Sequence, residues 1–369
     1  MKVLADYHHH DLWESLELLC ARLGWTLYRP IGMDWFDRGY WNHERSWHGD
    51  AIARQYLTPW GDDWSSSDDP GHSHRLDMSH DRIQNLVTLE QAHDLKPDIV
   101  ISTLAHNHEG MSRFAREVRA TFGLQLGNVR FSPTIDMIED RWDLASFGLV
   151  SGLMPGHSRD DIGKVLQSSQ YIDKPHVVYH QEFSLEDFHA SPVTPHDPLR
   201  IASFVQCFPE NERTYPLFVE AATSCPNYDW GVYGAYGSKP LDQWAKGNID
   251  TCRGVADAMR EVDIGWHGKC WSDGFGHVIH DWFAVGRPVI GYESYYRDQL
   301  AGPLWQEGVT SFDITDKTAH EVGNLLSELQ REPERIVAMG AAAAARFRQI
   351  VDYDAEEQAI RAMFSRVLP

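Results

Sequence analysis

Residues 272–291 read SDGFGHVIHDWFAVGRPVIG: a loop with two glycines, a helix over 277–285, a Gly-Arg-Pro turn and an apolar strand over 288–292. Gly274 and Gly276 allow the backbone to approach a ligand closely, because glycine has no Cβ. The first N–H groups of the following helix have no partner inside the helix, so they favour an anion such as phosphate. The segment therefore predicts a phosphate-binding turn that opens a helix.

Two carboxylates accompany this turn. Asp273 and Asp281 are eight residues apart, so a helical rotation of ~100° per residue brings both to roughly the same side of the helix start. Carboxylates in such positions accept hydrogen bonds from sugar hydroxyls. Both are therefore candidates for sugar binding beside the phosphate-binding turn.

The same segment resembles the C-terminal domain of GT-B glycosyltransferases, especially the large retaining family with an E-x7-E element written EGFG...E before a small-Gly-Arg-Pro-Val turn. In that family the first acid contacts the transferred sugar, the Gly-Phe-Gly backbone holds the diphosphate, and the second acid binds the ribose. The resemblance gives these roles to Asp273, to Gly274, Phe275 and Gly276, and to Asp281. Both carboxylates here are one methylene shorter than the glutamates of the family pattern.

The resemblance extends over residues 199–369 and implies further donor contacts. The family neutralises the diphosphate with an Arg/Lys pair. Arg213 stands at the lysine position, whereas Gln206 stands at the arginine position. Lys269, four residues before Asp273, is the candidate for the missing charge.

Alternating strands and helices predict two α/β domains in tandem. Residues 184–198 contain three prolines at spacing three and predict an extended linker. We predict an N-terminal Rossmann-like acceptor domain over 1–185, a linker over 186–198, and a C-terminal Rossmann-like nucleotide-sugar-binding domain over 199–354. The helix over 355–369 is expected to pack back on the first domain. This is the GT-B architecture, in which two Rossmann-like domains face each other across a cleft.

The hydrophobic pattern also predicts individual elements. Helices are expected at 11–23, 112–122, 212–223, 255–262 and 277–285, and over 332–368 with a break near 352–354. Strands are expected at 1–7, 26–31, 98–104, 124–129, 147–150, 176–179, 199–208, 229–234 and 288–292.

Histidines follow two of the expected strands. His8, His9 and His10 come after the first strand, at the edge where open α/β sheets bind ligands, and are predicted to face the acceptor. In GT-B enzymes a histidine after the strand corresponding to 98–104 contacts the donor sugar or the leaving group. By this resemblance His106 and His108 join Asp273 as catalytic candidates. Solvated loop histidines without a chemical role are the alternative for both groups.

Five tryptophans lie between residues 35 and 64, in a chain with 14 Trp and 20 His. Flat side chains with an apolar face and a polar edge suit ring-shaped ligands such as sugars and bases, although core packing is the alternative for most of them. Residues 32–85 form an apparent insertion between two strands, where GT-B enzymes commonly diversify acceptor recognition. Trp35 and Trp41 are therefore acceptor candidates.

The net charge of −21 argues against a general nucleic-acid coat protein. Apolar runs are shorter than a membrane span, and the N-terminus lacks a secretory pattern, so we expect a cytoplasmic protein without a membrane partner. Five cysteines without a CxxC pair indicate reduced, mostly buried thiols. The polar segment that contains His72, His74 and Asp77 has a metal-like composition but reads as a loop. We predict no metal and no cofactor.

These features imply a retaining, metal-independent glycosyltransferase that moves a sugar from a nucleoside diphosphate sugar, with UDP favoured, to an acceptor hydroxyl. The opening sequence also resembles phage-type glycosyltransferases, some of which modify hydroxymethylated pyrimidines in DNA. Modified DNA is therefore one acceptor candidate, with the host cytoplasm as the location. Two alternatives stay open: a nucleotide-sugar epimerase on the same fold, and a non-catalytic nucleotide-sugar-binding protein.

Overall fold

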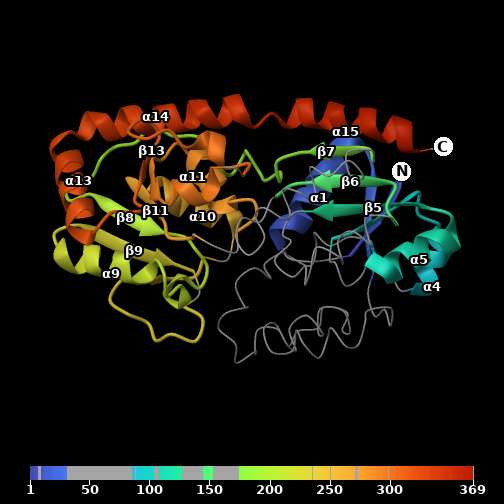
Figure 1. Ribbon diagram of the computed structural model, residues 1–369, viewed down its shortest axis with the longest axis horizontal. Helices are drawn as coiled ribbons and strands as arrows, with labels where there is room; N and C mark the ends of the chain where they lie inside the picture. Colours follow the sequence, from blue (N-terminus) through green and yellow to red (C-terminus); the bar gives the residue numbers. More distant parts are fainter. Residues whose placement is uncertain are drawn as a thin grey trace. The chain divides into compact units, whose positions relative to one another are not determined.

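The computed structural model describes residues 1–6, 10–30, 85–87, 89–103, 108–126, 144–152, 174–234, 236–249, 251–270, 273–297 and 299–368. They form two compact units, each built on a parallel sheet (Figure 1). Unit 1 contains the described residues up to Phe183 together with the C-terminal segment from Tyr353. Unit 2 contains residues 184–352.

Unit 1 has seven parallel strands in the order β3-β2-β1-β4-β5-β6-β7. The chain runs outward from β1 to β3 and returns to β4 on the other side of β1, so the topological switch point lies between β1 and β4. Strand β4 is completely buried, and so are Val3, Leu4 and Ala5 of β1, as their apolar sequences predict. The strands are β1 (Lys2–Ala5), β2 (Thr26–Pro30), β3 (Leu86–Val87), β4 (Ile99–Ser102), β5 (Thr121–Leu126), β6 (Phe147–Val150) and β7 (His176–Val178), and the helices between them include α1 (His10–Leu23), α4 (Leu89–Leu95) and α5 (His108–Val118).

The C-terminal helix α15 (Tyr353–Val367) belongs to the core of unit 1. The Phe364 ring packs edge-on against Trp25 and Phe147, with ring centroids 4.8 and 4.7 Å apart. At the start of the helix, the Glu356 carboxylate accepts a hydrogen bond from the backbone N–H of His180 at 3.0 Å. The chain therefore leaves unit 2 after α14 (Pro333–Ile350) and completes unit 1.

Unit 2 repeats the same topology with six parallel strands in the order β10-β9-β8-β11-β12-β13. Its switch point lies between β8 and β11. The order in both sheets confirms the predicted pair of Rossmann-like folds. The strands are β8 (Arg200–Ser203), β9 (Asp229–Tyr233), β10 (Ala245–Gly247), β11 (Ile264–His267), β12 (Val289–Gly291) and β13 (Ser311–Asp313), and the helices are α9 (Tyr215–Ser224), α10 (Cys252–Arg260), α11 (His277–Ala284), α12 (Glu293–Tyr296), α13 (Ala319–Arg331) and α14.

Aromatic side chains fill the core of unit 2. Phe218 contacts Trp230 and Trp266 edge-on, with ring centroids 5.3 and 5.5 Å apart. Trp282 on α11 is also completely buried. These tryptophans therefore contribute to packing, in agreement with the alternative that the sequence left open for most of them.

Several predicted boundaries are wrong, and two elements differ from their predicted ranges by four or five residues at an end. The helix expected at 112–122 is α5, which begins a turn earlier and ends at Val118. Arg119 adopts a left-handed backbone conformation with φ of 61°, and this ends the helix before strand β5. The strand expected at 199–208 ends at Ser203, and a short 3-10 turn, η4, follows over Phe208–Glu210.

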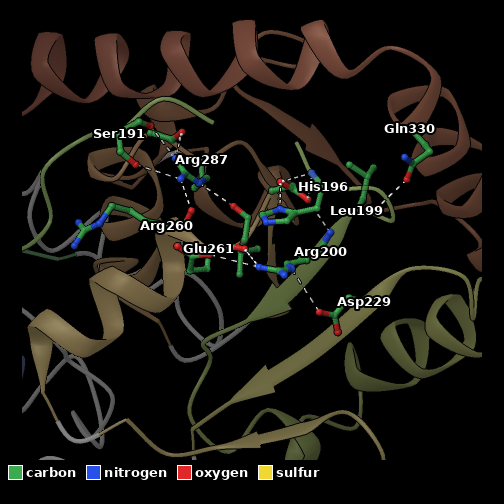
Figure 2. A network of polar contacts seen from close by, with 12 residues as sticks. Ser191, His196, Leu199, Arg200, Asp229, Arg260, Glu261, Arg287 and Gln330 are labelled. Atoms are coloured by element: carbon green, nitrogen blue, oxygen red, sulfur yellow. Dashed lines mark hydrogen bonds and ion pairs between the residues drawn. The ribbon is translucent and has the colours of Figure 1, made fainter. Parts of the chain in front are cut away.

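Buried charges hold the proline-rich segment at the amino edge of the unit 2 sheet (Figure 2). Arg287 precedes β12 and is 2% exposed. Its guanidinium donates to the carbonyl oxygens of Val262 and Ser191, at 2.8 and 2.9 Å, and to the Ser191 hydroxyl at 3.2 Å. Burial lowers the pKa of Arg287 to about 10, so the group is still charged at neutral pH.

Asp263 makes a second attachment from the start of β11. Its carboxylate accepts hydrogen bonds from the backbone N–H of Arg200 at 2.8 Å and from the backbone N–H of His196 at 3.2 Å. The His196 ring nitrogen Nδ1 lies 2.9 Å from the same carboxylate. The segment predicted to be an extended linker is thus fixed at Ser191 and at His196.

Candidate functional site

The candidate site lies at the carboxyl edge of the unit 2 sheet, beside its switch point. Strand β11 ends at the buried His267, and the loop that follows leads through Asp273 to helix α11. The loop begins at Gly268, whose carbonyl oxygen accepts hydrogen bonds from the Thr214 hydroxyl and from Asn211 Nδ2. A Cβ on Gly268 would come within 2.0 Å of the Phe208 ring, so this position requires glycine.

These contacts bring Arg213 close to the loop. Arg213 lies between Asn211 and Thr214, both of which bind Gly268. Burial raises the pKa of the Cys270 thiol, and the positive charge of Arg213 partly offsets this rise. The predicted donor residues Arg213 and Lys269 therefore both place positive charge at the end of β11.

Asp273 is held by groups from three parts of unit 2. Its Oδ1 accepts a hydrogen bond from the backbone N–H of Gly276 at 2.9 Å. Its Oδ2 accepts one from the Tyr296 hydroxyl at 2.8 Å. His267 Nε2 lies 2.6 Å from the same hydroxyl and 3.7 Å from Oδ2.

The surroundings keep this carboxylate ionised. Burial raises the pKa of Asp273, but the Lys269 ammonium, His267 and the Gly276 amide outweigh burial and hold that pKa well below its usual range. Burial lowers the pKa of His267. A negative charge therefore faces the start of α11 next to a neutral imidazole.

Tyr295 fixes the main chain of Asp273. The Tyr295 hydroxyl accepts a hydrogen bond from the Asp273 N–H at 2.8 Å and donates one to the Asp273 carbonyl oxygen at 3.1 Å. Both tyrosines belong to α12, directly after β12. The sequence analysis missed them together with His267, because their contacts depend on the pairing of β11 with β12.

Gly276 is the N-cap of α11 and has φ of 78°. Its carbonyl oxygen accepts the backbone N–H of His280 at 3.1 Å and lies 2.9 Å from His280 Nδ1. The buried Phe275 ring stacks on the His280 ring, with centroids 4.1 Å apart. The Gly-Phe-Gly turn thus closes against the first turn of α11, as the glycine spacing predicts.

We expect Gly276→Ala to destabilise unit 2 by about 2–3 kcal/mol, because the left-handed conformation disfavours a Cβ and the site is crowded. The added Cβ would lie 3.0 Å from the Ala301 Cβ and 3.2 Å from the Tyr296 ring. Denaturant unfolding measures the loss. Gly308→Ala is the matched control, since Gly308 has φ of 70° but its nearest neighbouring atom is 4.0 Å from a Cβ. Equal losses in both variants would contradict the role given to the crowding.

The other predicted donor residues lie on α11 and beside β9. Asp281 is the fifth residue of α11, one helical turn after its start, and is 5% exposed. The Gln206 side chain lies against Gly234 at the end of β9, where its Oε1 would be 2.9 Å from a Cβ. Gln206 is therefore next to the end of β9.

The predicted residues of unit 1 are only partly described. His108 is the first residue of α5 and is 4% exposed. The backbone of His10 begins α1. The candidates His8, His9, Trp35, Trp41 and His106 lie outside the described residues.

Asp6 is a residue of unit 1 that the sequence analysis missed. It follows β1 at the switch point, is completely buried, and accepts hydrogen bonds from the Ser102 hydroxyl and the Thr103 N–H after β4. A carboxylate directly after the first strand is the signal that identifies it. Asp6 ties together the two strand ends that flank the switch point.

Three further observations concern the described part of the chain alone. It contains no group of three or more His, Cys, Asp or Glu side chains that could hold a metal ion. None of its helices combines the length and the apolar character that a membrane crossing requires. None of the five cysteines forms a disulfide, and only Cys20 is buried, so the prediction of mostly buried thiols is wrong.

Comparisons with known proteins identify the architecture. No protein-family model matches the sequence, and no curated protein matches it. HepE from Anabaena, in its complex with UDP-glucose, aligns with a TM-score of 0.64 at 13% identity, over 99% of this chain and all of HepE. The chain has the GT-B fold.

Two other solved structures share this GT-B fold along their whole length. A glycosyltransferase from Rickettsia africae aligns with a TM-score of 0.62 at 12% identity, over 100% of this chain and 98% of that one. Sucrose-phosphate synthase from Thermosynechococcus elongatus aligns with a TM-score of 0.58 at 12% identity, over 100% and 99%. The GT-B fold expected from the 272–291 segment is therefore confirmed.

Proposed function

We propose that this protein is a glycosyltransferase that uses a UDP-sugar as donor and binds it at the carboxyl edge of the unit 2 sheet. The observation that carries the proposal is the ionised Asp273 beside the glycine turn of α11, next to the switch point of a Rossmann-like sheet. The similarity to HepE supports the choice of nucleotide, because HepE has been solved with UDP and with UDP-glucose.

In this proposal each donor group meets a specific part of unit 2. The diphosphate lies against the turn at 274–276, whose Gly276 N–H already donates to Asp273, and it binds the amides of Gly274, Phe275 and the first turn of α11, where the helix dipole favours negative charge. Arg213 and Lys269 neutralise it, Asp281 accepts from the ribose hydroxyls, and Asp273 accepts from hydroxyls of the transferred sugar. Gln206, whose side chain lies next to the end of β9, is a further proposed contact to the donor.

The reaction is electrostatic in character. As the bond between the anomeric carbon and the diphosphate breaks, negative charge grows on the leaving phosphate, and the cationic groups and helix amides stabilise it. The acceptor oxygen forms the new bond to the anomeric carbon, and its proton passes to the departing phosphate. The anomeric configuration is retained and no metal ion takes part, as in the family that the motif resembles.

We propose that the acceptor binds to unit 1. The proposed location of the protein is the cytoplasm. His8, His9, His10, Trp35 and Trp41 are the proposed contacts of the acceptor, and His106 and His108 are the proposed catalytic residues of unit 1. Among hydroxyl acceptors, hydroxymethylated pyrimidines in DNA are the first to test. The net charge of −21 repels DNA and therefore argues against this acceptor. Transfer of the sugar to such DNA but not to unmodified DNA would support this acceptor. Transfer only to free sugars or polysaccharides would contradict it.

Asp281→Ala should abolish most of the thermal stabilisation by nucleotide. A ligand at about 100 times its dissociation constant adds ~2.7 kcal/mol of stability, so UDP should raise the melting temperature of the wild type by several degrees. We expect UDP to act more strongly than GDP or ADP, and Asp281→Ala to lose most of the shift. Asp316→Ala, at an exposed position of the same unit, is the control.

Equal shifts in Asp281→Ala and in the wild type would contradict the ribose role of Asp281. Product analysis then separates the proposed transferase from the two alternatives. An epimerase converts the nucleotide sugar without an acceptor, and a non-catalytic binding protein leaves it unchanged with every acceptor.

A further inference from the structure

We propose that Tyr296, oriented by His267, positions the Asp273 carboxylate to receive hydroxyl groups of the donor sugar. The inference rests on the proposed function, because it deepens the description of the same donor site. It assigns a positioning role to two residues outside the 272–291 segment. The assignment follows from the hydrogen bonds that converge on Asp273.

The direction of these hydrogen bonds is determined by the protonation of the three groups. Burial raises the pKa of the Tyr296 hydroxyl well above its ordinary value, so the phenol is neutral, whereas Asp273 is ionised. The Tyr296 O–H therefore donates to Asp273 Oδ2, at 2.8 Å. Its oxygen then accepts a hydrogen bond from His267 Nε2–H, at 2.6 Å.

This direction fixes the tautomer of His267. The neutral imidazole carries its proton on Nε2, and Nδ1 is an acceptor. Among the residues that the structure describes, Nδ1 has no hydrogen-bond partner, although the side chain is completely buried. A buried acceptor without a partner costs stability. His267 therefore holds the Tyr296 hydroxyl in place through Nε2, while its own Nδ1 receives no hydrogen bond from the described residues.

Tyr296 is itself held in one orientation. It is completely buried, and its ring stacks on Trp305 with an interplanar angle of 13°. The Tyr296 Cε1 atom would lie 3.2 Å from a Cβ on Gly276. The ring thus packs against the glycine turn whose amide binds the other carboxylate oxygen.

The remaining acceptor capacity of Asp273 is what a sugar would use. Each carboxylate oxygen has two lone-pair directions, and each already accepts one hydrogen bond, from Gly276 N–H and from Tyr296. In the part of the chain that the structure describes, no other donor takes the second direction on either oxygen, and a sugar hydroxyl would use it. Because the carboxylate is fixed before the ligand arrives, it loses little side-chain freedom on binding.

Tyr296→Phe tests this proposal, since it removes the hydroxyl and keeps the ring. Calorimetric titrations with UDP and with UDP-glucose compare the nucleotide alone with the nucleotide that carries a sugar. We expect affinity for UDP-glucose to fall about 10-fold, the loss of one hydrogen bond to a charged group, and affinity for UDP to stay within about 2-fold. Tyr228→Phe is the control, because Tyr228 is buried in the same unit and its hydroxyl is 3.5 Å from Ser327 Oγ.

A double variant shows whether Tyr296 acts through Asp273. We expect Tyr296→Phe to have no additional effect on UDP-glucose affinity in an Asp273→Asn background. Additive losses, or equal losses for UDP and UDP-glucose in the single variant, would overturn the positioning role and leave the proposed function intact. Failure of the wild type to bind either UDP or UDP-glucose would overturn both.

A second measurement needs no ligand. Nitrogen chemical shifts of the His267 ring, from NMR of the full chain labelled at histidine, report which nitrogen carries the proton. We expect the Nε2–H tautomer in the wild type and a changed Nε2 shift in Tyr296→Phe. A wild-type ring protonated on Nδ1 would contradict the proposed orientation, even if the binding results agreed with it.

Discussion

Asp273→Asn should lower kcat/KM for the UDP-sugar by a factor of about 100 to 1,000, the range for losing a preorganised electrostatic contact to the reacting groups. The carboxylate is ionised because its pKa is held well below the usual range. The substitution therefore removes a full negative charge while conserving the size of the side chain. The Asn side chain also carries an NH2 group in place of one carboxylate oxygen. Either the Gly276 N–H or the Tyr296 hydroxyl then faces a donor instead of an acceptor.

Steady-state kinetics with varied donor concentration measure this effect. Asp273→Glu is the informative partner, because it keeps the charge and adds the methylene of the family pattern; its loss should be much smaller. Circular dichroism of both variants checks that the fold is kept. A kcat/KM for Asp273→Asn within about 3-fold of wild type would contradict a sugar contact through this carboxylate.

Arg287→Met should destabilise unit 2 by about 3–5 kcal/mol, the range for breaking a buried charged hydrogen-bond network. The guanidinium donates to the carbonyl oxygens of Val262, Ser191, Val285 and Gly286. Methionine fills part of the volume but leaves these buried acceptors without donors. Because Val285 and Gly286 follow the last residue of α11, the loss is also expected to loosen the C-terminal end of this helix.

Thermal unfolding measures this loss, with an expected decrease of about 10 °C in the melting temperature. Arg253→Met is the matched control, because Arg253 also binds the proline-rich segment, through Asp187, but from an exposed position. Its melting temperature should stay close to that of the wild type. A similar small change for Arg287→Met would contradict the role of the buried guanidinium.

The sequence predicts the parts of the fold that depend on local patterns. Continuous apolar runs such as 98–104 identify the buried central strands, and the two glycines before a helical segment identify the start of α11. The choice of Asp273 as the proposed donor-site carboxylate follows from its place in that turn. Local patterns are weaker where a single backbone conformation ends an element, as Arg119 does for α5.

The contacts that tune the site could not be predicted in the same way. Tyr296 lies 23 residues beyond Asp273, and the two meet because β11 and β12 are paired in register. The acceptors of Arg287 likewise come from several separate segments of unit 2. No periodicity in the sequence predicts these contacts between distant residues, because they form only when the sheet is assembled.

The most direct test of the central claim is a crystal structure of the protein with UDP. The account predicts the diphosphate at the turn 274–276 and the start of α11, with the ribose hydroxyls against Asp281. The cavity of about 530 Å³ at the opposite, amino edge of the sheet, lined by Ser191, His196, Arg260 and Arg287, should stay free of nucleotide. UDP bound in that cavity, or anywhere away from α11, would contradict the account.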